Sequence, residues 1–215
     1  MTSVAKNRSK PPRSLASLWL LIGVFALPLM AAWLFFLNPQ WLPIGHTNNG
    51  TLITPPRPVE SLMLQTAEGT PFDWQTLQDM WSMTLVSEGG CDAACIEMLI
   101  NVRQIRRATA ANRQRIARVL ILLPDADGRI TTPNLEGLEG TQLLIADKHQ
   151  RTAVESLFPL QLSEQAIPIF LIDPRGDLMM VHDTTINTSK QILQDLEKLL
   201  KASQSWAKGG QYGHQ

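Results

Sequence analysis

The distribution of apolar and polar positions divides the chain into one long hydrophobic segment and a region of shorter elements. Residues 15–37 contain no charged side chain and are almost entirely apolar. Beyond residue 58, short apolar runs typical of strands alternate with stretches in which apolar residues recur every three or four positions, as on one face of a helix. This pattern predicts one hydrophobic helix followed by a domain of the α/β class.

The α/β region is predicted to contain strands and helices in a mixed order. The continuous apolar run at residues 118–123 predicts a strand buried on both faces, as in a parallel sheet. An Asp-Pro-x-Gly turn at residues 173–176 predicts an antiparallel hairpin. In full, strands are expected at residues 59–65, 81–86, 118–123, 142–146, 169–173 and 177–182, a short amphipathic segment at 72–80, and helices at 92–112, 153–158 and from 189 onward.

The hydrophobic segment is predicted to span a membrane. About 20 apolar residues cross a hydrocarbon core of roughly 30 Å. Residues 1–14 carry four basic residues and no acidic one, so the positive-inside rule places them in the cytoplasm. The segment is longer than the hydrophobic part of a signal peptide, about 7–15 residues. An uncleaved anchor is therefore expected, with a cleaved signal as the alternative.

These patterns predict a linear domain organisation. Five prolines and two glycines between residues 38 and 58 are typical of an extended linker. The expected parts are a basic cytoplasmic tail at residues 1–14, a transmembrane helix at 15–37, a Pro-rich linker at 38–58, the α/β domain at 59–203 and a flexible tail at 204–215.

Charge and motifs exclude several classes of function. The formal net charge is zero, so the chain is not a globally basic nucleic-acid binder, and no nucleic-acid partner is expected. The sequence also lacks a nucleotide-binding glycine motif, a zinc-type cysteine and histidine quartet, and a serine-triad signature.

Chemistry is concentrated in the only two cysteines, Cys91 and Cys95, which follow Gly89 and Gly90. Residues four apart lie on one face of a helix, and one turn rises about 5.4 Å, so a disulfide between them is geometrically possible. The N-terminal end of a helix favours a thiolate. Two thiolates held close form either a redox couple or a site for a soft metal ion such as Cu(I). A purely structural disulfide is the alternative.

Six arginines and no acidic residue occur between Glu97 and Asp125. One interpretation of this segment is a docking surface for an acidic partner or for anionic lipid head groups. The other is a solvated basic helix face.

The element order and several motifs resemble the thioredoxin fold, and within it the Sco/SenC family of copper chaperones for cytochrome c oxidase. The dithiol at the start of the first core helix and the terminal hairpin and helix carry the first resemblance. The Cys-x-x-x-Cys spacing, the hairpin at residues 170–178, the single anchor and the Pro-rich linker carry the second. The segments at 49–58, 103–106 and 178–180 also resemble a proteobacterial membrane-protein group associated with oxidase assembly genes.

The resemblance implies a thioredoxin-like domain at residues 59–203, held in the periplasm by a single-pass anchor in the inner membrane. It implies that Pro168 is a cis-proline facing the dithiol, and that Cys91 and Cys95 bind Cu(I). Sco proteins carry a histidine shortly before the hairpin, but residues 163–168 contain none. His149 and His182 are the other candidate copper ligands, with ordinary surface histidines as the alternative interpretation. The absence of a histidine from the family position favours dithiol redox activity.

Three functions remain open on this basis. The first is an assembly factor for cytochrome c oxidase, which handles Cu(I) or reduces the thiols of its target, with an oxidase subunit or another assembly factor as partner. The second is an enzyme, a general thiol–disulfide oxidoreductase with Cys91 as the attacking thiolate and Cys95 as the resolving one. The third is a membrane-anchored interaction module without catalytic activity.

Overall fold

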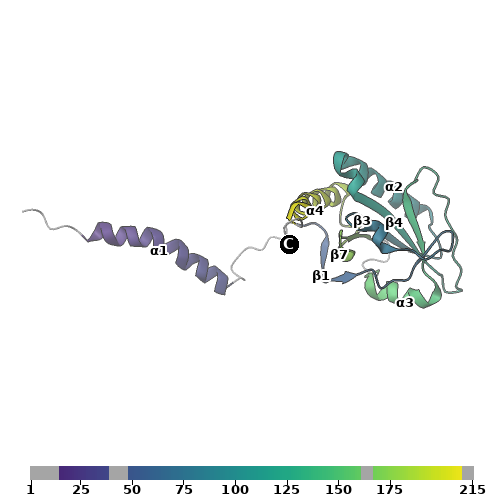
Figure 1. Cartoon of the computed structure of the whole chain (residues 1–215), viewed down its shortest axis with the longest axis horizontal. Helices are drawn as coiled ribbons and strands as arrows, with labels where there is room; N and C mark the ends of the chain where they lie inside the picture. The colour runs from purple at the N-terminus through teal and green to yellow at the C-terminus, as the bar shows by residue number, and fades with distance from the viewer. Residues whose placement is uncertain (1–14, 39–47, 161–166, 210–215) are drawn as a thin grey trace, which may run out of the picture. The chain divides into compact units, whose positions relative to one another are not determined.

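The computed structural model describes residues 15–38, 48–160 and 167–209, with side chains up to Ser203 (Figure 1). The chain divides into two compact units, Met1–Thr47 and Asn48–Gln215. In the first unit, helix α1 (Ala16–Leu37) has 22 residues and no buried side chain. Its length and apolar composition are sufficient to cross a membrane. The helix continues through Pro28, which lies near its middle.

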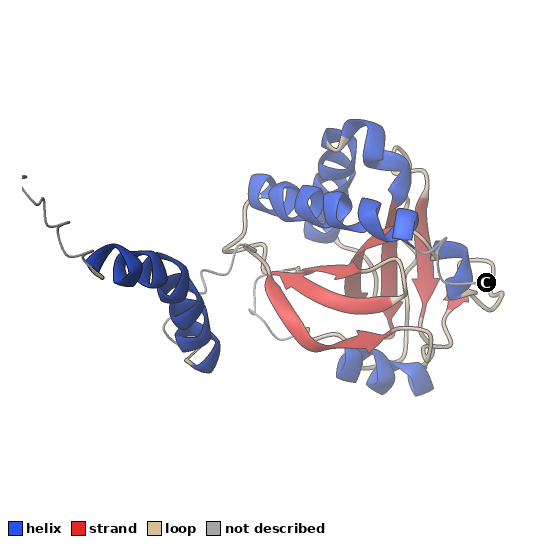
Figure 2. Cartoon of the chain, turned by 60° about the vertical axis from the view of Figure 1, so that its left-hand side comes forward, coloured by secondary structure: helices blue, strands red, loops and turns tan. Residues whose placement is uncertain are grey.

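The second unit is built on a seven-stranded mixed sheet with helices on both faces (Figure 2). The strand order is β1-β7-β6-β3-β4-β5-β2. Strands β3, β4 and β5 are parallel, whereas β6 and β7 are antiparallel to their neighbours. The elements are β1 (Thr51–Pro58), β2 (Gln65–Thr66), η2 (Trp74–Leu77), β3 (Trp81–Glu88), α2 (Ala93–Ala108), η3 (Ala110–Arg115), β4 (Ile116–Leu123), β5 (Thr141–Ile145), α3 (Lys148–Leu157), β6 (Ile169–Ile172), β7 (Asp177–His182) and α4 (Ser189–Gly209).

The two faces of the sheet form two hydrophobic clusters because side chains alternate along each strand. On β4, Val119 and Ile121 face one cluster, whereas Leu120 and Leu122 face the other. Helices α2 and α4 cover the second cluster, and α3 covers the first. The central strands β3 and β4 are buried along most of their length, which explains the nearly continuous apolar sequence of β4.

The Pro-rich linker was predicted to extend to residue 58, and this boundary is wrong. Residues Thr51–Pro58 form β1, which pairs antiparallel with β7. Prolines are tolerated there because β1 is an edge strand, and the register is interrupted between Leu52 and Arg57. Part of the predicted linker, residues 39–47, lies outside the described residues.

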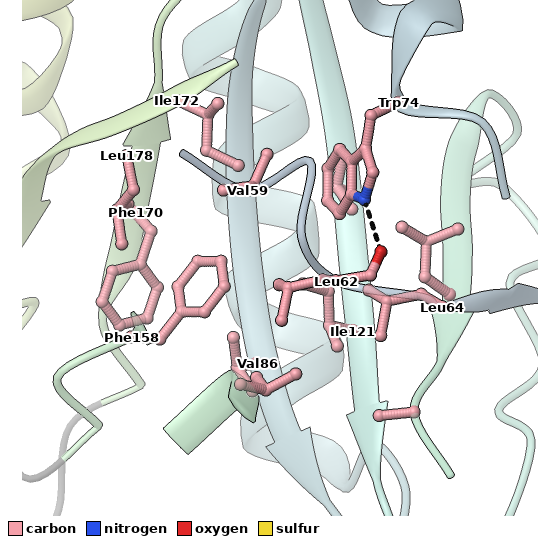
Figure 3. Packing of buried hydrophobic residues seen from close by; sticks show 14 of the residues in the cluster. Val59, Leu62, Leu64, Trp74, Val86, Ile121, Phe158, Phe170, Ile172 and Leu178 are labelled. Atoms are coloured by element: carbon pink, nitrogen blue, oxygen red, sulfur yellow. Dashed lines mark hydrogen bonds between the residues drawn. The ribbon is translucent and has the colours of Figure 1, made fainter. Parts of the chain in front are cut away.

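The first predicted strand, at residues 59–65, is also absent. This segment is irregular, and only Gln65–Thr66 forms a strand, β2. Its apolar residues Val59, Leu62 and Leu64 are buried in the cluster shown in Figure 3, where the Trp74 indole Nε1 donates a 3.0 Å hydrogen bond to the Leu62 carbonyl. The apolar pattern therefore predicted that Val59, Leu62 and Leu64 are buried, but it predicted the wrong backbone conformation for them.

The remaining predicted elements are present, with boundary shifts. The strands expected at 81–86, 118–123, 142–146 and 169–173 correspond to β3, β4, β5 and β6, and the hairpin to β6 and β7. The last helix begins at Ser189 as expected but continues to Gly209, whereas a flexible tail was predicted from residue 204. Residues 210–215 of that tail lie outside the described residues.

Candidate functional site

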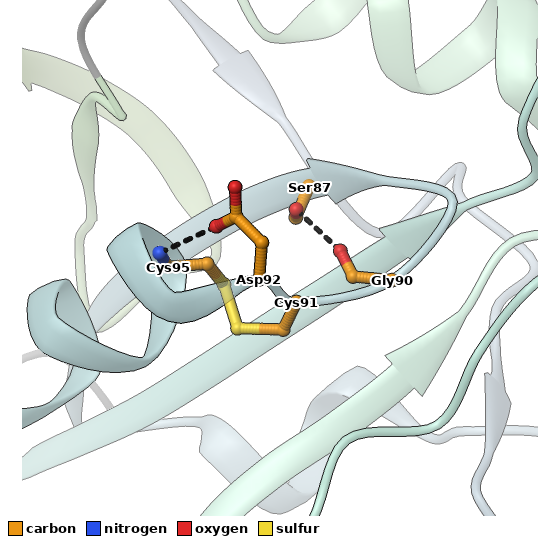
Figure 4. The surroundings of a disulfide bond; sticks show 5 residues. All are labelled: Ser87, Gly90, Cys91, Asp92 and Cys95. Atoms are coloured by element: carbon orange, nitrogen blue, oxygen red, sulfur yellow. Dashed lines mark hydrogen bonds between the residues drawn. A yellow bond between two sulfur atoms is a disulfide. The ribbon is translucent and has the colours of Figure 1, made fainter.

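Cys91 and Cys95 form a disulfide between the end of β3 and the start of α2 (Figure 4). Their Cα atoms are 5.2 Å apart, which confirms the prediction that the spacing allows a bridge. Cys95 is completely buried in the cluster beneath α2, whereas Cys91 is only half-buried. Cys91 is therefore the more accessible residue of the pair.

The helix carrying the pair begins later than the sequence indicated. Both cysteines were expected in the first turn, but α2 begins at Ala93 and Cys91 precedes its N-cap residue, Asp92. The Asp92 carboxylate accepts a 2.9 Å hydrogen bond from the backbone N–H of Cys95. This contact satisfies one of the free N–H groups at the helix start and fixes the backbone between the two sulfurs.

A glycine loop connects β3 to the disulfide. Gly89 and Gly90 have φ angles of 71° and 151°, which non-glycine residues rarely adopt. The Ser87 hydroxyl donates a 2.5 Å hydrogen bond to the Gly90 carbonyl (Figure 4). The N–H of Thr131, in the loop after β4, donates to the Gly89 carbonyl over 2.9 Å. The glycine loop before the cysteines is thus held by Ser87 of β3 and by Thr131 of the loop after β4.

We expect Gly90→Ala to destabilise the fold by about 1–3 kcal/mol, because a Cβ at Gly90 would lie 2.9 Å from the Thr131 carbonyl oxygen and the φ angle would be strained. Gly69→Ala is the matched control, since Gly69 has a φ of 79° but nothing within 4 Å of its Cβ position. Chemical unfolding of both variants measures the difference. Equal losses of stability in the two variants would show that the close approach to Thr131 adds nothing to the cost of the strained φ angle.

Pro168 is buried and directly precedes β6. Because β6 runs antiparallel to β3, Pro168 lies at the carboxyl end of β3, the end that leads to the cysteines. The expected cis peptide bond at this position is absent, since the cis bond among the described residues joins Thr54 to Pro55. The sequence resemblance thus located the proline at the correct end of the sheet but not its peptide geometry.

Neither candidate histidine joins the cysteines. His149 lies in the first turn of α3, on the opposite face of the sheet from α2. His182 ends β7, two strands away from β3 in the sheet. Within residues 15–38, 48–160 and 167–209, no three histidine, cysteine, aspartate or glutamate side chains converge as a metal site. Residues 163–166, most of the segment 163–168 that was compared with the family's histidine position, lie outside these ranges.

His182 instead belongs to a buried network where β1 begins. Its ring packs against Gly50, where a Cβ would lie 2.6 Å from the imidazole. Asp195 of α4, 1% exposed, accepts hydrogen bonds from the backbone N–H groups of Asn49 and Gly50 at 2.5 and 2.9 Å. Neither ring nitrogen of His182 makes a hydrogen bond of good geometry among the described residues, although the Asn187 side chain lies close to the ring. Burial lowers the pKa of His182 below its usual 6.5, although the Asp195 carboxylate and the Asn187 side chain act in the opposite direction.

The free energy of unfolding is therefore expected to fall as the pH decreases below about 6.5. There the unfolded chain protonates His182 while the folded protein keeps it neutral, so the unfolded state binds more protons. The slope reaches at most about 1.4 kcal/mol per pH unit. Chemical unfolding of the wild type and of His182→Phe between about pH 5 and about pH 7 isolates this contribution. Parallel pH profiles of the two proteins would contradict it.

Two hydrogen bonds that hold the cysteine pair were not predicted from the sequence, those of Asp92 and Thr131. The Asp92 cap has a sequence signal, an aspartate immediately before a run with helical periodicity. The contact between Thr131 and the cysteine loop has none, because it joins residues about 40 positions apart through backbone atoms.

Comparison with known proteins identifies the domain. Residues 81–203 match the family model described as "Transmembrane-like, thioredoxin-like, C-terminal domain". Among solved structures, apo Sco1 from Thermus thermophilus aligns with a TM-score of 0.54 and 16% identity over 73% of this chain and 99% of that chain. Yeast Sco1 gives 0.53 and 14% over 66% and 92%, and yeast Sco1 with copper bound gives 0.51 and 13% over 65% and 90%.

No curated protein sequence matches the chain. At these low identities, the structural similarity to Sco1 shows a shared fold and nothing more. It confirms the predicted thioredoxin-like architecture, which follows one candidate membrane helix. Because the family model covers more than half of the chain, the protein belongs to the family of transmembrane-like, thioredoxin-like C-terminal domains.

Proposed function

We propose that this protein is a membrane-anchored assembly factor for cytochrome c oxidase that acts on a target protein through Cys91 and Cys95. The thioredoxin-like domain is located in the periplasm, and α1 spans the inner membrane. One observation carries the proposal: the partly buried Cys91 is bonded to the fully buried Cys95 at the start of α2. Such an arrangement suits exchange with a thiol or disulfide outside the chain.

The exchange follows from the two different environments. In the reduced protein, the Cys91 thiolate attacks a disulfide of the target, forms a mixed disulfide and releases one target thiolate. The Cys95 thiolate then attacks the Cys91 sulfur, and the second target thiolate leaves. Two electrons pass to the target, which becomes a dithiol, while Cys91 and Cys95 become a disulfide. An external dithiol reduces this disulfide again for the next cycle.

The local structure favours this order of events. The partial positive charge at the start of α2 stabilises a thiolate at the cysteine loop. Cys95 is shielded by the side chains beneath α2, so an external disulfide meets Cys91 first. Because the backbone of both cysteines is held by the Asp92 cap and the glycine loop, the resolving sulfur stays close to the attacked one.

Cu(I) transfer uses the same reduced pair. Two cysteine thiolates are soft ligands that suit Cu(I), and an oxidised pair cannot bind the ion. A protein of the same fold, yeast Sco1, has been solved with copper bound. Copper is in this view a cargo, held by Cys91 and Cys95 until the target receives it.

The test is complementation in cells that lack the protein. Cys91→Ser and Cys95→Ser are each expected to abolish the recovery of cytochrome c oxidase activity, while both variants remain in the membrane at wild-type levels. Full recovery with both variants would reject the proposal and leave the interaction module without catalytic activity.

Copper handling has its own measurement. The reduced full chain in detergent micelles is expected to retain Cu(I) against a competing chelator with a stoichiometry of about one, and Cys91→Ser is expected to lose it. If the wild type loses Cu(I) as readily as the variant, the protein acts on the thiols of its target and not on copper.

A general thiol–disulfide oxidoreductase is the second candidate, favoured by the absence of a histidine from residues 163–168. That function predicts turnover on unrelated disulfide substrates. The assembly factor predicts exchange with an oxidase subunit at a rate far above the rate with such substrates. Steady-state reduction of insulin and of a purified copper-binding oxidase subunit, measured side by side, separates the two.

A further inference from the structure

The arginines near the carboxyl end of α2 form a cluster that the dithiol chemistry does not use. Arg103, Arg106 and Arg107 are three and four residues apart, so they share one side of the helix. Arg118 of β4 lies below them among the residues that face α2, and the charges of all three helix arginines act on it. We refer to these four residues as the arginine cluster.

The arginine cluster is only partly neutralised within the described part of the chain, where the Glu139 carboxylate acts on Arg103 and Arg118. The hydrogen bonds of its side chains go to carbonyl oxygens: Arg103 donates to Gly137, Arg106 to Ile116 over 2.7 Å, and Arg118 to Glu139. None of the four forms an ion pair within 4.0 Å in the ranges that the structure describes. The cluster is therefore a concentration of positive charge held in place by neutral acceptors.

Arg118 makes this imbalance costly. Its side chain is only 4% exposed, and its Nε and Nη1 atoms have no hydrogen-bond partner among the described residues. Burial and the three neighbouring guanidinium groups lower its pKa, and Glu139 only partly offsets them. An unpaired buried cation destabilises a fold. The solvated basic face considered from the sequence is therefore wrong for Arg118, and an external anion would relieve the repulsion.

The residue types indicate what kind of anion fits. The cluster contains only arginine, and the chain has no lysine between residues 11 and 147. A planar guanidinium pairs with a carboxylate or phosphate through two parallel hydrogen bonds, whereas diffuse attraction to a membrane surface does not distinguish arginine from lysine. The carbonyl contacts also orient the guanidinium groups of Arg103, Arg106 and Arg118 in advance. This favours directional recognition of carboxylates over general attraction to lipid.

One loop connects the arginine cluster to the disulfide. At one end, Thr131 donates to the Gly89 carbonyl beside the cysteines, and at the other end Gly137 accepts from Arg103. The loop therefore runs along the same flank of α2 from the dithiol to the arginines. At 1.5 Å per helical residue, Cys91 and Arg103 are separated by about 18 Å, the length of about five or six extended residues.

Given this arrangement, we propose that the arginine cluster binds an acidic segment of the target protein whose thiols react at Cys91. The proposal rests on the proposed function for the identity of the target, and on the cluster itself for the acidic chemistry. A target segment with aspartates or glutamates about five residues from its cysteine contacts both ends of α2 at once. Binding at the arginines raises the local concentration of the target thiol at Cys91.

The experiment uses the oxidised full chain in nanodiscs of neutral lipid and a labelled polyglutamate peptide that lacks cysteine. Fluorescence anisotropy is expected to show saturable binding that weakens with salt, because the Debye length falls from about 10 Å at 0.1 M to about 3 Å at 1 M. Arg103→Gln/Arg107→Gln is expected to weaken binding about tenfold or more. Both positions avoid the buried Arg118, and the urea unfolding midpoint of the variant checks that it is folded.

Three comparisons make the result decisive. Arg129→Gln/Arg175→Gln removes the same charge outside the cluster and is expected to bind like the wild type, whereas an equal loss in this control overturns the proposal. Arg103→Lys/Arg107→Lys keeps the charge and is expected to lie between the wild type and the glutamine variant. Anionic vesicles that bind in a cluster-dependent way, without any binding of polyglutamate, overturn it in favour of a lipid surface.

The two proposals fail separately. Cys91→Ser is expected to bind polyglutamate as tightly as the wild type, because the peptide carries no thiol. If thiol exchange at Cys91 proceeds but polyglutamate does not bind, the acidic-segment proposal is wrong and the proposed function stands. If polyglutamate binds but neither cysteine matters for oxidase activity, the cluster is a docking surface that serves some other target.

Discussion

Single-cysteine variants of this protein are expected to differ by about a hundredfold or more in their rate of reaction with an external disulfide. Cys95→Ser retains Cys91, which is only partly buried, whereas Cys91→Ser retains Cys95, which is completely buried. A buried thiol reacts only when the surrounding structure opens locally, and an opening free energy of about 3 kcal/mol corresponds to about a hundredfold. The measurement mixes each reduced full-length variant in detergent with an aromatic disulfide and follows the absorbance of the aromatic thiolate that is released.

The same variants also distinguish the two chemical roles. Cys95→Ser is expected to accumulate a mixed disulfide with its target, because the resolving thiol is missing, and Cys91→Ser is expected to trap nothing. A denatured sample of each variant is the control, since both thiols must then react at similar rates. Equal rates in the folded variants would reverse the assignment of attacking and resolving residues.

Phe170→Ala is expected to lower the free energy of unfolding by about 3–5 kcal/mol, the range for truncating a buried phenylalanine. Phe170 lies on β6 with no exposed surface, and its ring meets that of Phe158 edge to face at a centroid distance of 5.0 Å (Figure 3). A domain of this size is stable by only about 5–15 kcal/mol, so the loss is a large fraction of the total. Urea unfolding followed by tryptophan fluorescence gives the value.

Ile186→Ala is the matched control, because Ile186 is 74% exposed. Its change in stability is expected to stay within about 0.5 kcal/mol. Comparable small losses in both variants would mean that the cluster containing Phe170 is not the main source of stability.

The central part of the fold was predictable from the sequence because burial there leaves a strong local signal. Strand β4 has a nearly uninterrupted apolar sequence since both faces of the sheet are covered by helices (Figure 2). The hairpin of β6 and β7 was predictable from its Asp-Pro-x-Gly turn. The last helix was predictable from an apolar stripe on one face.

The edges of the sheet were not predictable in the same way. Strand β1 contains three prolines and was interpreted as a linker, because proline normally excludes a strand and the pairing partner β7 lies far along the chain. Val59, Leu62 and Leu64 are buried without forming a strand, because this segment packs on the core as a loop, while Met63 between them is exposed. Long-range pairing and tertiary burial decided both segments, and neither leaves a local pattern.

The candidate site was predictable in its residues but not in its environment. The spacing of Cys91 and Cys95 was sufficient to predict that they lie close together. Which sulfur is shielded depends on the packing of α2 against the sheet, and the burial of Arg118 depends on the alternation of faces along β4. These properties come from the assembled domain and are invisible in the segment itself.

The reduction potential of the Cys91–Cys95 disulfide tests the central claim most directly. The full chain is equilibrated with thiol redox buffers, and the fraction of bonded cysteines is read by alkylation and mass. A pair that exchanges with an external target is expected to have a potential above about −300 mV. A potential well below about −300 mV would show a structural bridge that stays closed, and the account of this protein as a thiol- or copper-handling factor would be contradicted.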